Sequence, residues 1–353
     1  MKRIALLGAT GSIGRQAIEI VEKHPELELV AAASGAQPIE GLAPLTQVGG
    51  DLTELLERAQ PDVVLNAVVG FAGLPATLWA LEHGVTLALA NKESLVAAGE
   101  LALAARERGG GLLLPVDSEH SAAFQCLEGH SGDQVDSLVL TGSGGPFRGR
   151  SRDELEDVTP EDALAHPTWR MGPKITIDSA TLANKGLELL EAHFLFGLGY
   201  DRIEVVLQPT SIVHALVRLR DGAVLAHLGY PDMRVPISFA LMYPERAATS
   251  VPPLDLSQGL VLEFEPPDPE TFPLLALARY AGEQGGTYPC AFNAANEVAV
   301  AAFLARRLPF LGIAPTVEET LAAVDGSPAR DLAELVEADA AARRLVERGL
   351  PVV

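Results

Sequence analysis

Short apolar runs alternate with amphipathic segments over the first 116 residues of the chain. The apolar runs predict strands at residues 3–7, 28–34, 63–68, 86–90 and 111–116. The amphipathic segments predict helices at residues 13–22, 73–83 and 94–107. Strands and helices that alternate in this way are typical of a parallel sheet. We therefore expect an α/β chain whose residues 1–116 form an N-terminal Rossmann-like domain.

From about residue 137 the apolar runs are longer and alternate more regularly. They predict strands in SLVLTGSG (137–144), KITIDS (174–179), RIEVVLQP (202–209), IVHALVRL (212–219) and AVLAHLG (223–229). We expect a central α+β domain at residues 117–243. Residues 244–273 contain seven prolines and little periodicity, which predicts a linker. Helical patterns near 274–284, 293–306, 316–324 and 330–348 predict a small C-terminal helical domain at residues 274–353.

The charge and the cysteine content limit the partners and the compartment of the chain. It carries 47 acidic and 26 basic residues, a net charge of −21, which opposes binding to nucleic acid or to anionic membranes. Two cysteines, Cys126 and Cys290, cannot form a disulfide framework. The N-terminal sequence lacks a signal-peptide pattern, and no apolar run reaches about 18 residues. We therefore expect a cytoplasmic protein without nucleic-acid or membrane partners.

Only five of the 26 basic residues are lysines, and Lys92, Lys174 and Lys185 lie in short polar segments. A chain that uses arginine for general charge retains lysine where a compact ammonium group is needed. These three lysines indicate chemistry, and chance placement is the alternative for each one.

A glycine-rich turn follows the first predicted strand and opens the first predicted helix. Gly8, Gly11 and Gly14 have the spacing GxxGxxG, and Thr10 and Ser12 add hydroxyl groups. Small residues at this place let the backbone approach a pyrophosphate at the helix N-terminus, so the turn predicts dinucleotide binding. A simple tight turn is the alternative.

The end of the second predicted strand bears on the choice of cofactor. It reads Ala33, Ser34, Gly35, Ala36, without the carboxylate that usually binds the ribose of NAD. The missing carboxylate favours NADP, although no lysine or arginine is present there either.

Two acidic segments are candidates for a metal site. PVDSEHSA (115–122) places Asp117 and Glu119 on one side of what we expect to be extended chain. Carboxylates at this spacing share a site only when a cation is present, and the alternative is a solvated loop. In KITIDSATLANKGLELLEAHFLFG (174–197) we expect a strand, then Asp178 and Ser179 as cap candidates, then a helix. One face of this helix carries Asn184, Glu188 and Glu191, with Lys185 beside them.

The same helix contains Gly186, which costs about 1 kcal/mol relative to alanine and therefore indicates close packing. An ordinary solvated helix face is the alternative. Upstream, HPTWRMG (166–172) predicts a lid that carries Trp169, or else a loop whose tryptophan plugs the core. TGSGGPFR (141–148) places Ser143 in a glycine-rich turn that suits an anion, or in a plain strand connection.

Seven motifs occur in order: GATGSIG, LANKESLV, PVDSEHSA, LTGSGGPFR, HPTWRMGPKITIDSATLANKGLELLEA, LGYPDMRVPI and FNAANEVAV. Together they resemble the 1-deoxy-D-xylulose-5-phosphate reductoisomerase family over nearly the whole chain. The stretch 166–192 is very specific, whereas the glycine turn is shared with many reductases. The resemblance implies that 1-deoxy-D-xylulose 5-phosphate is converted to 2-C-methyl-D-erythritol 4-phosphate, in the non-mevalonate isoprenoid route. It implies NADPH and Mg²⁺ or Mn²⁺ as cofactors, a phosphorylated sugar as substrate, and a homodimer.

The resemblance also implies residue roles by matching position. Metal ligands would be Asp117, Glu119 and Glu188, and the catalytic residues would be these three with Lys92 and His166. Substrate-binding residues would be Lys92, Ser118, Glu119, Ser143, His166, Trp169, Met171, Ser179, Asn184, Lys185 and Glu188. Cofactor-binding residues would be Gly8, Thr10, Gly11, Ser12, Ile13, Gly14, Ser34, Gly35, Asn91, Lys92, Glu93 and Gly172.

The chain departs from the family pattern at two places. SGAQ (34–37) stands where members commonly carry a basic residue, and QPTS, beginning at Gln208, stands where many have HPQS. Residues 36–60 also look shorter than the corresponding segment of the family.

Two other functions are alternatives: a different Rossmann reductase, such as a semialdehyde or homoserine dehydrogenase, and an NADP-binding regulator without catalysis. A semialdehyde dehydrogenase would need an activated cysteine, and neither cysteine lies in such a setting.

Overall fold

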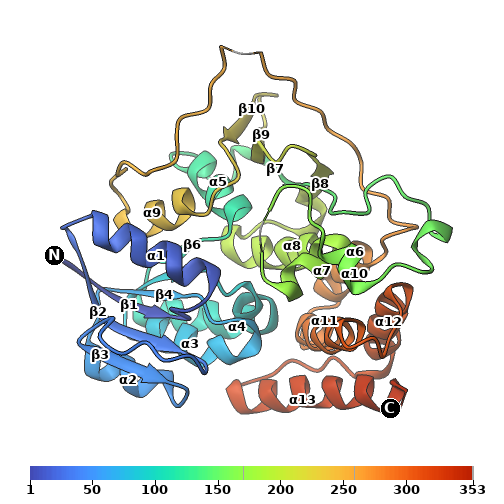
Figure 1. The fold of residues 1–353 in the computed structure, drawn as a ribbon, viewed down its shortest axis with the longest axis horizontal. Coiled ribbons are helices and arrows are strands. Elements are labelled where there is room, and N and C mark those ends of the chain that lie inside the picture. Colours follow the sequence, from blue (N-terminus) through green and yellow to red (C-terminus); the bar gives the residue numbers. More distant parts are fainter. Residues whose placement is uncertain (170, 258, 352–353) are drawn as a thin grey trace. The chain divides into compact units, whose positions relative to one another are not determined.

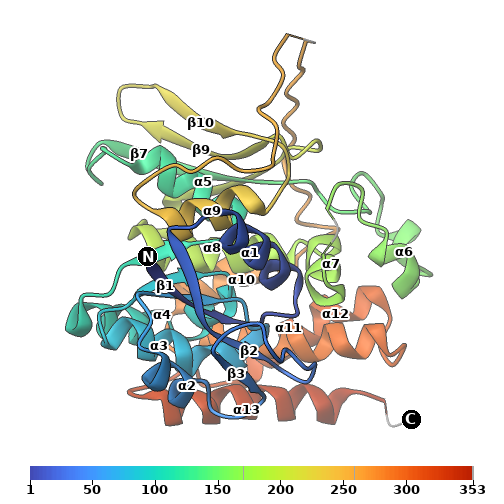
Figure 2. The same cartoon turned by 60° about the vertical axis from the view of Figure 1, so that its left-hand side comes forward.

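A computed structural model describes residues 1–169, 171–257 and 259–351 of the chain. The chain divides into two compact units. Unit 1 comprises residues 1–95, 99–125 and 232–255, and unit 2 comprises residues 96–98, 126–231 and 256–353. Figures 1 and 2 show the ribbon in two views. Among the described residues, no helix has both the length and the apolar character needed to cross a membrane.

Unit 1 is built on a six-stranded parallel sheet with the strand order β3-β2-β1-β4-β5-β6. Its strands are β1 (Lys2–Leu7), β2 (Leu27–Ser34), β3 (Leu45–Val48), β4 (Val63–Asn66), β5 (Thr86–Leu89) and β6 (Leu113–Pro115). Its helices are α1 (Ser12–Lys23), α2 (Leu52–Ala59), α3 (Leu74–Glu82), α4 (Lys92–Gly109), α5 (Ser118–Leu127) and α9 (Arg234–Met242), with the 3-10 turn η1 (Gly70–Gly73). The order reverses between β1 and β4, the point at which sheets of this type bind nucleotides. The Rossmann-like prediction is confirmed.

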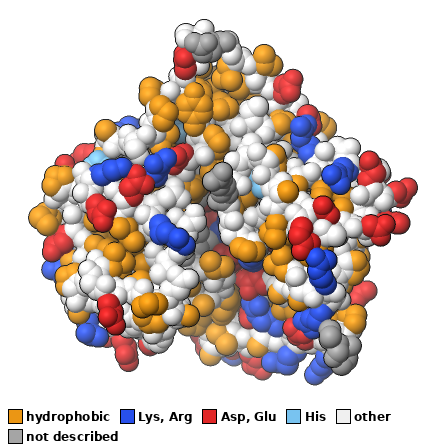
Figure 3. All heavy atoms as spheres, viewed as in Figure 1, with side chains coloured by type: hydrophobic (Ala, Val, Ile, Leu, Met, Phe, Trp, Pro, Cys, Tyr) orange, Lys and Arg blue, Asp and Glu red, His pale blue; other side chains and the backbone are white. Residues whose placement is uncertain are grey.

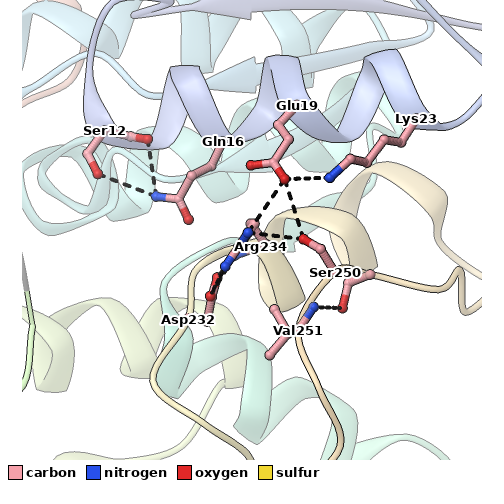
Figure 4. A network of polar contacts seen from close by, with 9 residues as sticks. Ser12, Gln16, Glu19, Lys23, Asp232, Arg234, Ser250 and Val251 are labelled. Carbon is pink, nitrogen blue, oxygen red and sulfur yellow. Dashed lines mark hydrogen bonds and ion pairs between the residues drawn. The ribbon is translucent and has the colours of Figure 1, made fainter.

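Residues 232–255 belong to unit 1 because α9 packs into its core. Ile237 and Leu241 of α9 are fully buried, in one cluster with Leu6 of β1 and Ile20 of α1. Polar contacts join the same two helices (Figure 4). Arg234 binds both carboxylate oxygens of Asp232, donates to the Ser250 hydroxyl at 3.0 Å, and lies 3.5 Å from Glu19 of α1.

Unit 2 contains a four-stranded mixed sheet with the order β10-β9-β7-β8. Its strands are β7 (Val135–Gly142), β8 (Ile203–Leu207), β9 (Val213–Leu219) and β10 (Val224–Leu228). Its helices are α6 (Pro160–Leu164), α7 (Pro173–Ala180), α8 (Ala183–Phe196), α10 (Leu274–Gln284), α11 (Tyr288–Leu304), α12 (Ile313–Ala323) and α13 (Leu332–Gly349). Three 3-10 turns complete it: η2 (Asp153–Leu155), η3 (Tyr200–Arg202) and η4 (Phe310–Gly312). The four predicted C-terminal helices are thus present.

The proline-rich segment has almost no regular secondary structure. Its described residues between 244 and 273 form no helix or strand, apart from a bridge that pairs Glu265 with Leu207.

Two local predictions are wrong. KITIDS forms most of helix α7 rather than a strand, so Asp178 and Ser179 lie inside a helix and do not cap α8. Helix α8 begins at Ala183, after Leu182 in a left-handed conformation. Asp117 and Glu119 do not lie on extended chain either, because α5 begins at Ser118. Asp117 instead accepts the backbone N–H of Glu119 at 3.2 Å, the bond that a helix N-cap makes.

Candidate active site

In unit 1, the glycine turn joins β1 to α1 in a form that leaves no room for side chains at two positions. A Cβ at Gly8, whose φ is +87°, would lie 2.4 Å from the carbonyl oxygen of Ala67. A Cβ at Gly14 would lie 2.3 Å from the carbonyl oxygen of Gly8. Helix α1 starts at Ser12, and the first N–H groups of a helix lack intrahelical acceptors. The turn, which includes Thr10, Gly11 and Ile13, therefore fits a dinucleotide pyrophosphate.

The first turn of α4 holds the next group of expected cofactor residues. Asn91 caps the helix by accepting the backbone N–H of Ser94 at 2.9 Å. Its amide also donates to the carbonyl of Gly70 at 2.7 Å, which fixes the loop after β4. Lys92 and Glu93 follow in the same turn, and both are buried. Lys92 Nζ lies 2.8 Å from Asp117 Oδ2, so the segments NKES and PVDSEH meet in unit 1.

At the start of α5, Ser118 donates to the carboxylate of Glu119. The fully buried His120 lies 3.5 Å from Asp117 Oδ1 through its Nδ1. His120 was not predicted as a site residue. Its signal is its helical position three residues after Asp117, which becomes visible only when α5 is assigned.

In unit 2, His166 brings two expected phosphate-binding serines together. Its Nε2 lies 3.1 Å from Ser143 Oγ and 3.1 Å from Ser179 Oγ. Its Nδ1 accepts the backbone N–H groups of Thr168 at 3.2 Å and Trp169 at 3.0 Å. Because Nδ1 accepts, the neutral ring carries its proton on Nε2. Burial lowers the pKa of His166, which favours this neutral form.

The segment 166–172 leads directly into α7. Trp169 lies with its ring centroid 6.4 Å from that of His214, Met171 follows, and Gly172 is the N-cap residue of α7. The side chain of Trp169 is therefore neither isolated in solvent nor a central part of the core, since the residue is partly exposed.

Helix α8 orders the remaining polar residues of unit 2. Glu188 is fully buried and accepts from Asn184 at one carboxylate oxygen and from Lys185 Nζ at the other, at 2.5 Å for the lysine. The aliphatic stem of Lys185 passes over Gly142, where a Cβ would lie 3.0 Å from the lysine Cε. A Cβ at Gly186 would lie 2.6 Å from that of Ala278 on α10, which confirms the close packing expected there.

Asp117 and Glu119 of unit 1 and Glu188 of unit 2 are acidic residues that could hold a metal ion. Their donors are carboxylate oxygens only, the type that Mg²⁺ and Mn²⁺ prefer, so the donor chemistry fits the expected cations.

A second polar network in unit 2 was missed from sequence. The buried Asp178 accepts from Lys174 Nζ at 2.9 Å and from the Asn296 amide at 2.7 Å. Lys174 and Asp178 are four residues apart, which is an ion-pair signal only once the segment is known to be helical. Gln208 is also buried, and its side-chain oxygen accepts the backbone N–H groups of Ile212 and Val213 at 2.8 and 3.2 Å. In this chain Gln208 thus holds the turn between β8 and β9.

Comparison with known proteins covers both units. The family model described as 1-deoxy-D-xylulose 5-phosphate reductoisomerase matches residues 4–49 and 45–99. The model described as the 1-deoxy-D-xylulose 5-phosphate reductoisomerase C-terminal domain matches residues 113–196. A further model, described as the DXP reductoisomerase C-terminal domain, matches residues 228–345. The 1-deoxy-D-xylulose 5-phosphate reductoisomerase of Geobacillus kaustophilus (strain HTA426) is 49% identical over 98% of this chain and 99% of its own length.

Solved structures agree with this match. The Zymomonas mobilis 1-deoxy-D-xylulose 5-phosphate reductoisomerase in complex with NADPH has a TM-score of 0.90 at 39% identity, covering 98% of each chain. A DOX-P reductoisomerase in complex with NADPH, fosmidomycin and magnesium has a TM-score of 0.89 at 36% identity, covering 99% of this chain and 98% of its own. The chain therefore belongs to the 1-deoxy-D-xylulose 5-phosphate reductoisomerase family.

Proposed function

We propose that Asp117, Glu119 and Glu188 hold the divalent cation of this enzyme, with Lys92 and His166 as further catalytic residues. The enzyme converts 1-deoxy-D-xylulose 5-phosphate to 2-C-methyl-D-erythritol 4-phosphate and depends on NADPH and a divalent metal. The single observation that supports the residue assignment is that all three residues offer carboxylate oxygens, a set that could hold a metal ion. When bound, a divalent cation stabilises negative charge that develops on substrate oxygens.

The substrate phosphate is assigned to Ser143, Ser179, Asn184 and Lys185. Nε2–H of His166 lies within 3.1 Å of both serine hydroxyl oxygens, which can accept from it and keep their own O–H groups to donate to a phosphate. Lys185 adds a buried positive charge, held in place by Glu188. Binding a phosphate remote from the reacting carbons orients those carbons. Met171 and Trp169, in the segment before α7, are assigned to the cover that excludes water.

The cofactor is assigned to the glycine turn and to the first turn of α4. The turn residues Gly8, Gly11 and Gly14 offer backbone N–H groups to the pyrophosphate, with Thr10, Ser12 and Ile13 beside it. Asn91, Lys92 and Glu93 lie at the carboxyl end of β5, on the nicotinamide side of the strand-order reversal. Ser34, Gly35 and Gly172 complete the assigned set. We propose NADPH binding for residues 1–116, catalysis for 117–243, and a helical domain at 274–353 after the linker 244–273.

A homodimer is supported by apolar side chains that unit 2 exposes. β10 is an edge strand whose Val224 is 51% exposed, and in the proline-rich segment Leu256 and Val261 are 67% and 74% exposed. Figure 3 shows hydrophobic side chains gathered near the top of the view. Exposed apolar surface of this kind is typical of protein interfaces. We expect light scattering to give twice the chain mass, and Leu256→Asp with Val261→Asp to give a monomer.

Two further points are part of the proposal. Mn²⁺ is expected to replace Mg²⁺, because both ions prefer oxygen ligands. Localisation in the cytoplasm is supported by Cys126 and Cys290, which form no disulfide.

The test of the proposed function is direct. The protein is incubated with 1-deoxy-D-xylulose 5-phosphate, Mg²⁺ or Mn²⁺, and NADPH, and nicotinamide absorbance is followed. We expect NADPH oxidation that stops when the metal is chelated, with 2-C-methyl-D-erythritol 4-phosphate as the product by mass spectrometry. Absence of metal-dependent oxidation would contradict the proposal.

A further inference from the structure

We propose that Arg15 binds the adenosine 2′-phosphate of NADPH and thereby determines the preference of this enzyme for NADPH over NADH. The inference rests on the cofactor assignment of the proposed function. The 2′-phosphate is the only group by which the two cofactors differ, and it requires a cation or several strong donors. The chain must supply these near the end of β2, where a sheet of this type binds the adenosine ribose.

The loop after β2 cannot supply the cation itself. Residues 24–57 contain six carboxylates and no lysine or arginine. The hydroxyl of Ser34 donates to the carbonyl of Gln37, so its proton is already used within the loop. A 2′-phosphate at this place would meet backbone N–H groups and a negative local field. A cation from another element is therefore needed.

Arg15 is the one candidate among the basic residues of the first 60 positions, all of which the structure describes. Lys2 and Arg3 lie at the start of β1, on the opposite edge of the sheet. Arg58 is in the last turn of α2, and Lys23, in the last turn of α1, is paired with Glu19 at 2.6 Å. Arg15 alone lies in the first turn of α1, at the carboxyl edge of the strands.

The position of Arg15 connects the glycine turn with the β2 end. Its Nε donates to the carbonyl of Thr10 at 3.0 Å, which holds the guanidinium against the turn. Hydrogen bonds also connect the glycine turn to β2, because the N–H groups of Gly8 and Ala9 donate to the carbonyl of Ala33 at 3.0 and 2.9 Å. The residue is exposed, and none of the described residues forms an ion pair with it. Its two terminal nitrogens can therefore bind a phosphate in the bidentate manner typical of arginine.

The experiment measures dissociation constants of NADPH and NADH by calorimetry, without substrate, for the full-length protein. The variants are Arg15→Gln and, as a matched control, Arg58→Gln, which removes the same charge from the far end of α2. A charge-assisted contact predicts that Arg15→Gln weakens NADPH binding by roughly 10- to 100-fold and changes NADH binding by less than about twofold. Arg58→Gln is expected to leave both constants unchanged. Arg15→Lys should retain part of the preference.

Two outcomes would overturn the inference. Equal weakening of NADPH and NADH in Arg15→Gln would place Arg15 at the pyrophosphate, and unchanged NADPH binding would remove it from the site. A thermal melt that matches the wild type establishes that the variant is folded, and Arg15→Lys provides a second folded variant. If the wild-type protein itself fails to bind NADPH, the proposed function fails instead, so the two failures are distinguishable.

Discussion

Lys92 Nζ lies 2.8 Å from Oδ2 of Asp117, and the two residues come from different motifs of the chain. The parallel pairing of β5 with β6 explains their meeting, because Lys92 begins the helix after β5 and Asp117 lies two residues after the end of β6. Both side chains are largely shielded from water, at 8% and 12% exposed. An ion pair in such a place fixes the orientation of the carboxylate that we assign to the metal.

Replacing Glu188 with glutamine should abolish most metal-dependent turnover. The amide keeps the shape of the side chain but removes the negative charge that we assign to the cation. We expect steady-state turnover to fall by about 100-fold or more. Loss of a residue that only supports a metal ligand already costs roughly 10- to 100-fold, and loss of a ligand should cost at least as much. The dissociation constant of NADPH should stay within about twofold. Glu283→Gln, on the exposed face of α10, is the control and should behave as wild type; full activity of Glu188→Gln would refute the assignment.

Protonation of His166 should destabilise the fold, because Nδ1 could then no longer accept the backbone N–H groups of Thr168 and Trp169. Burial lowers the pKa of His166, so below its ordinary value of about 6.5 the folded chain binds fewer protons at this ring than the unfolded chain does. The stability from the neutral ring is therefore complete above about pH 6.5 and falls as the pH drops below it. Urea unfolding at pH 5.5 and 7.5 should show a smaller pH effect in His166→Gln than in the wild type. Identical pH effects would show that the ring does not matter.

Asn296→Ala should destabilise the fold. The amide of Asn296 donates to the buried Asp178, as Lys174 also does, and its loss leaves a carboxylate oxygen without that donor. We expect the free energy of unfolding to fall by about 1–3 kcal/mol. The exposed Gln284→Ala, at the end of α10, should change it by less than about 0.5 kcal/mol. A loss in Asn296→Ala no larger than in this control would contradict the role of the network.

Gly186 and Ala278 should show energetic coupling. A methyl group at Gly186 would lie 2.6 Å from the Cβ of Ala278, so Gly186→Ala should lower the free energy of unfolding by about 1–3 kcal/mol despite its better helix propensity. Ala278→Gly removes the clashing atom. The double variant should then be more stable than the sum of the two single effects predicts, as measured by urea denaturation. If the two single effects on the free energy of unfolding simply added, α8 and α10 would accommodate the extra methyl group without cost, which would contradict the predicted coupling.

The N-terminal sheet could be predicted from the sequence because its buried parallel strands are short, continuous apolar runs between helical patterns. RIALL and the second strand, 28–34, correspond closely to β1 and β2. β3 and α2 were not predicted, since LTQV has alternating rather than continuous burial and follows a loop rich in glycine and proline.

The error at KITIDS has an identifiable cause. Two isoleucines and a threonine favour a strand, but α7 begins after Gly172 and Pro173, which favour a helix start. The threonine hydroxyl bonds back to the carbonyl of Gly172 at 2.9 Å, a helical contact. For the site, matching motifs located candidate residues, and Gly186 indicated close packing. The residue that packs on it, Ala278, and the partners of Asp178 depend on tertiary contacts between distant helices. One sequence carries no signal for those partners.

The most direct test of the account is anomalous diffraction from crystals of the full-length enzyme soaked in Mn²⁺. We predict one ion bound by carboxylate oxygens of Asp117, Glu119 and Glu188, at bond lengths of about 2.0–2.6 Å. The same crystals of Glu188→Gln should lose the ion or most of its occupancy. An ion held by other residues, or one that binds unchanged without the Glu188 carboxylate, would contradict the account.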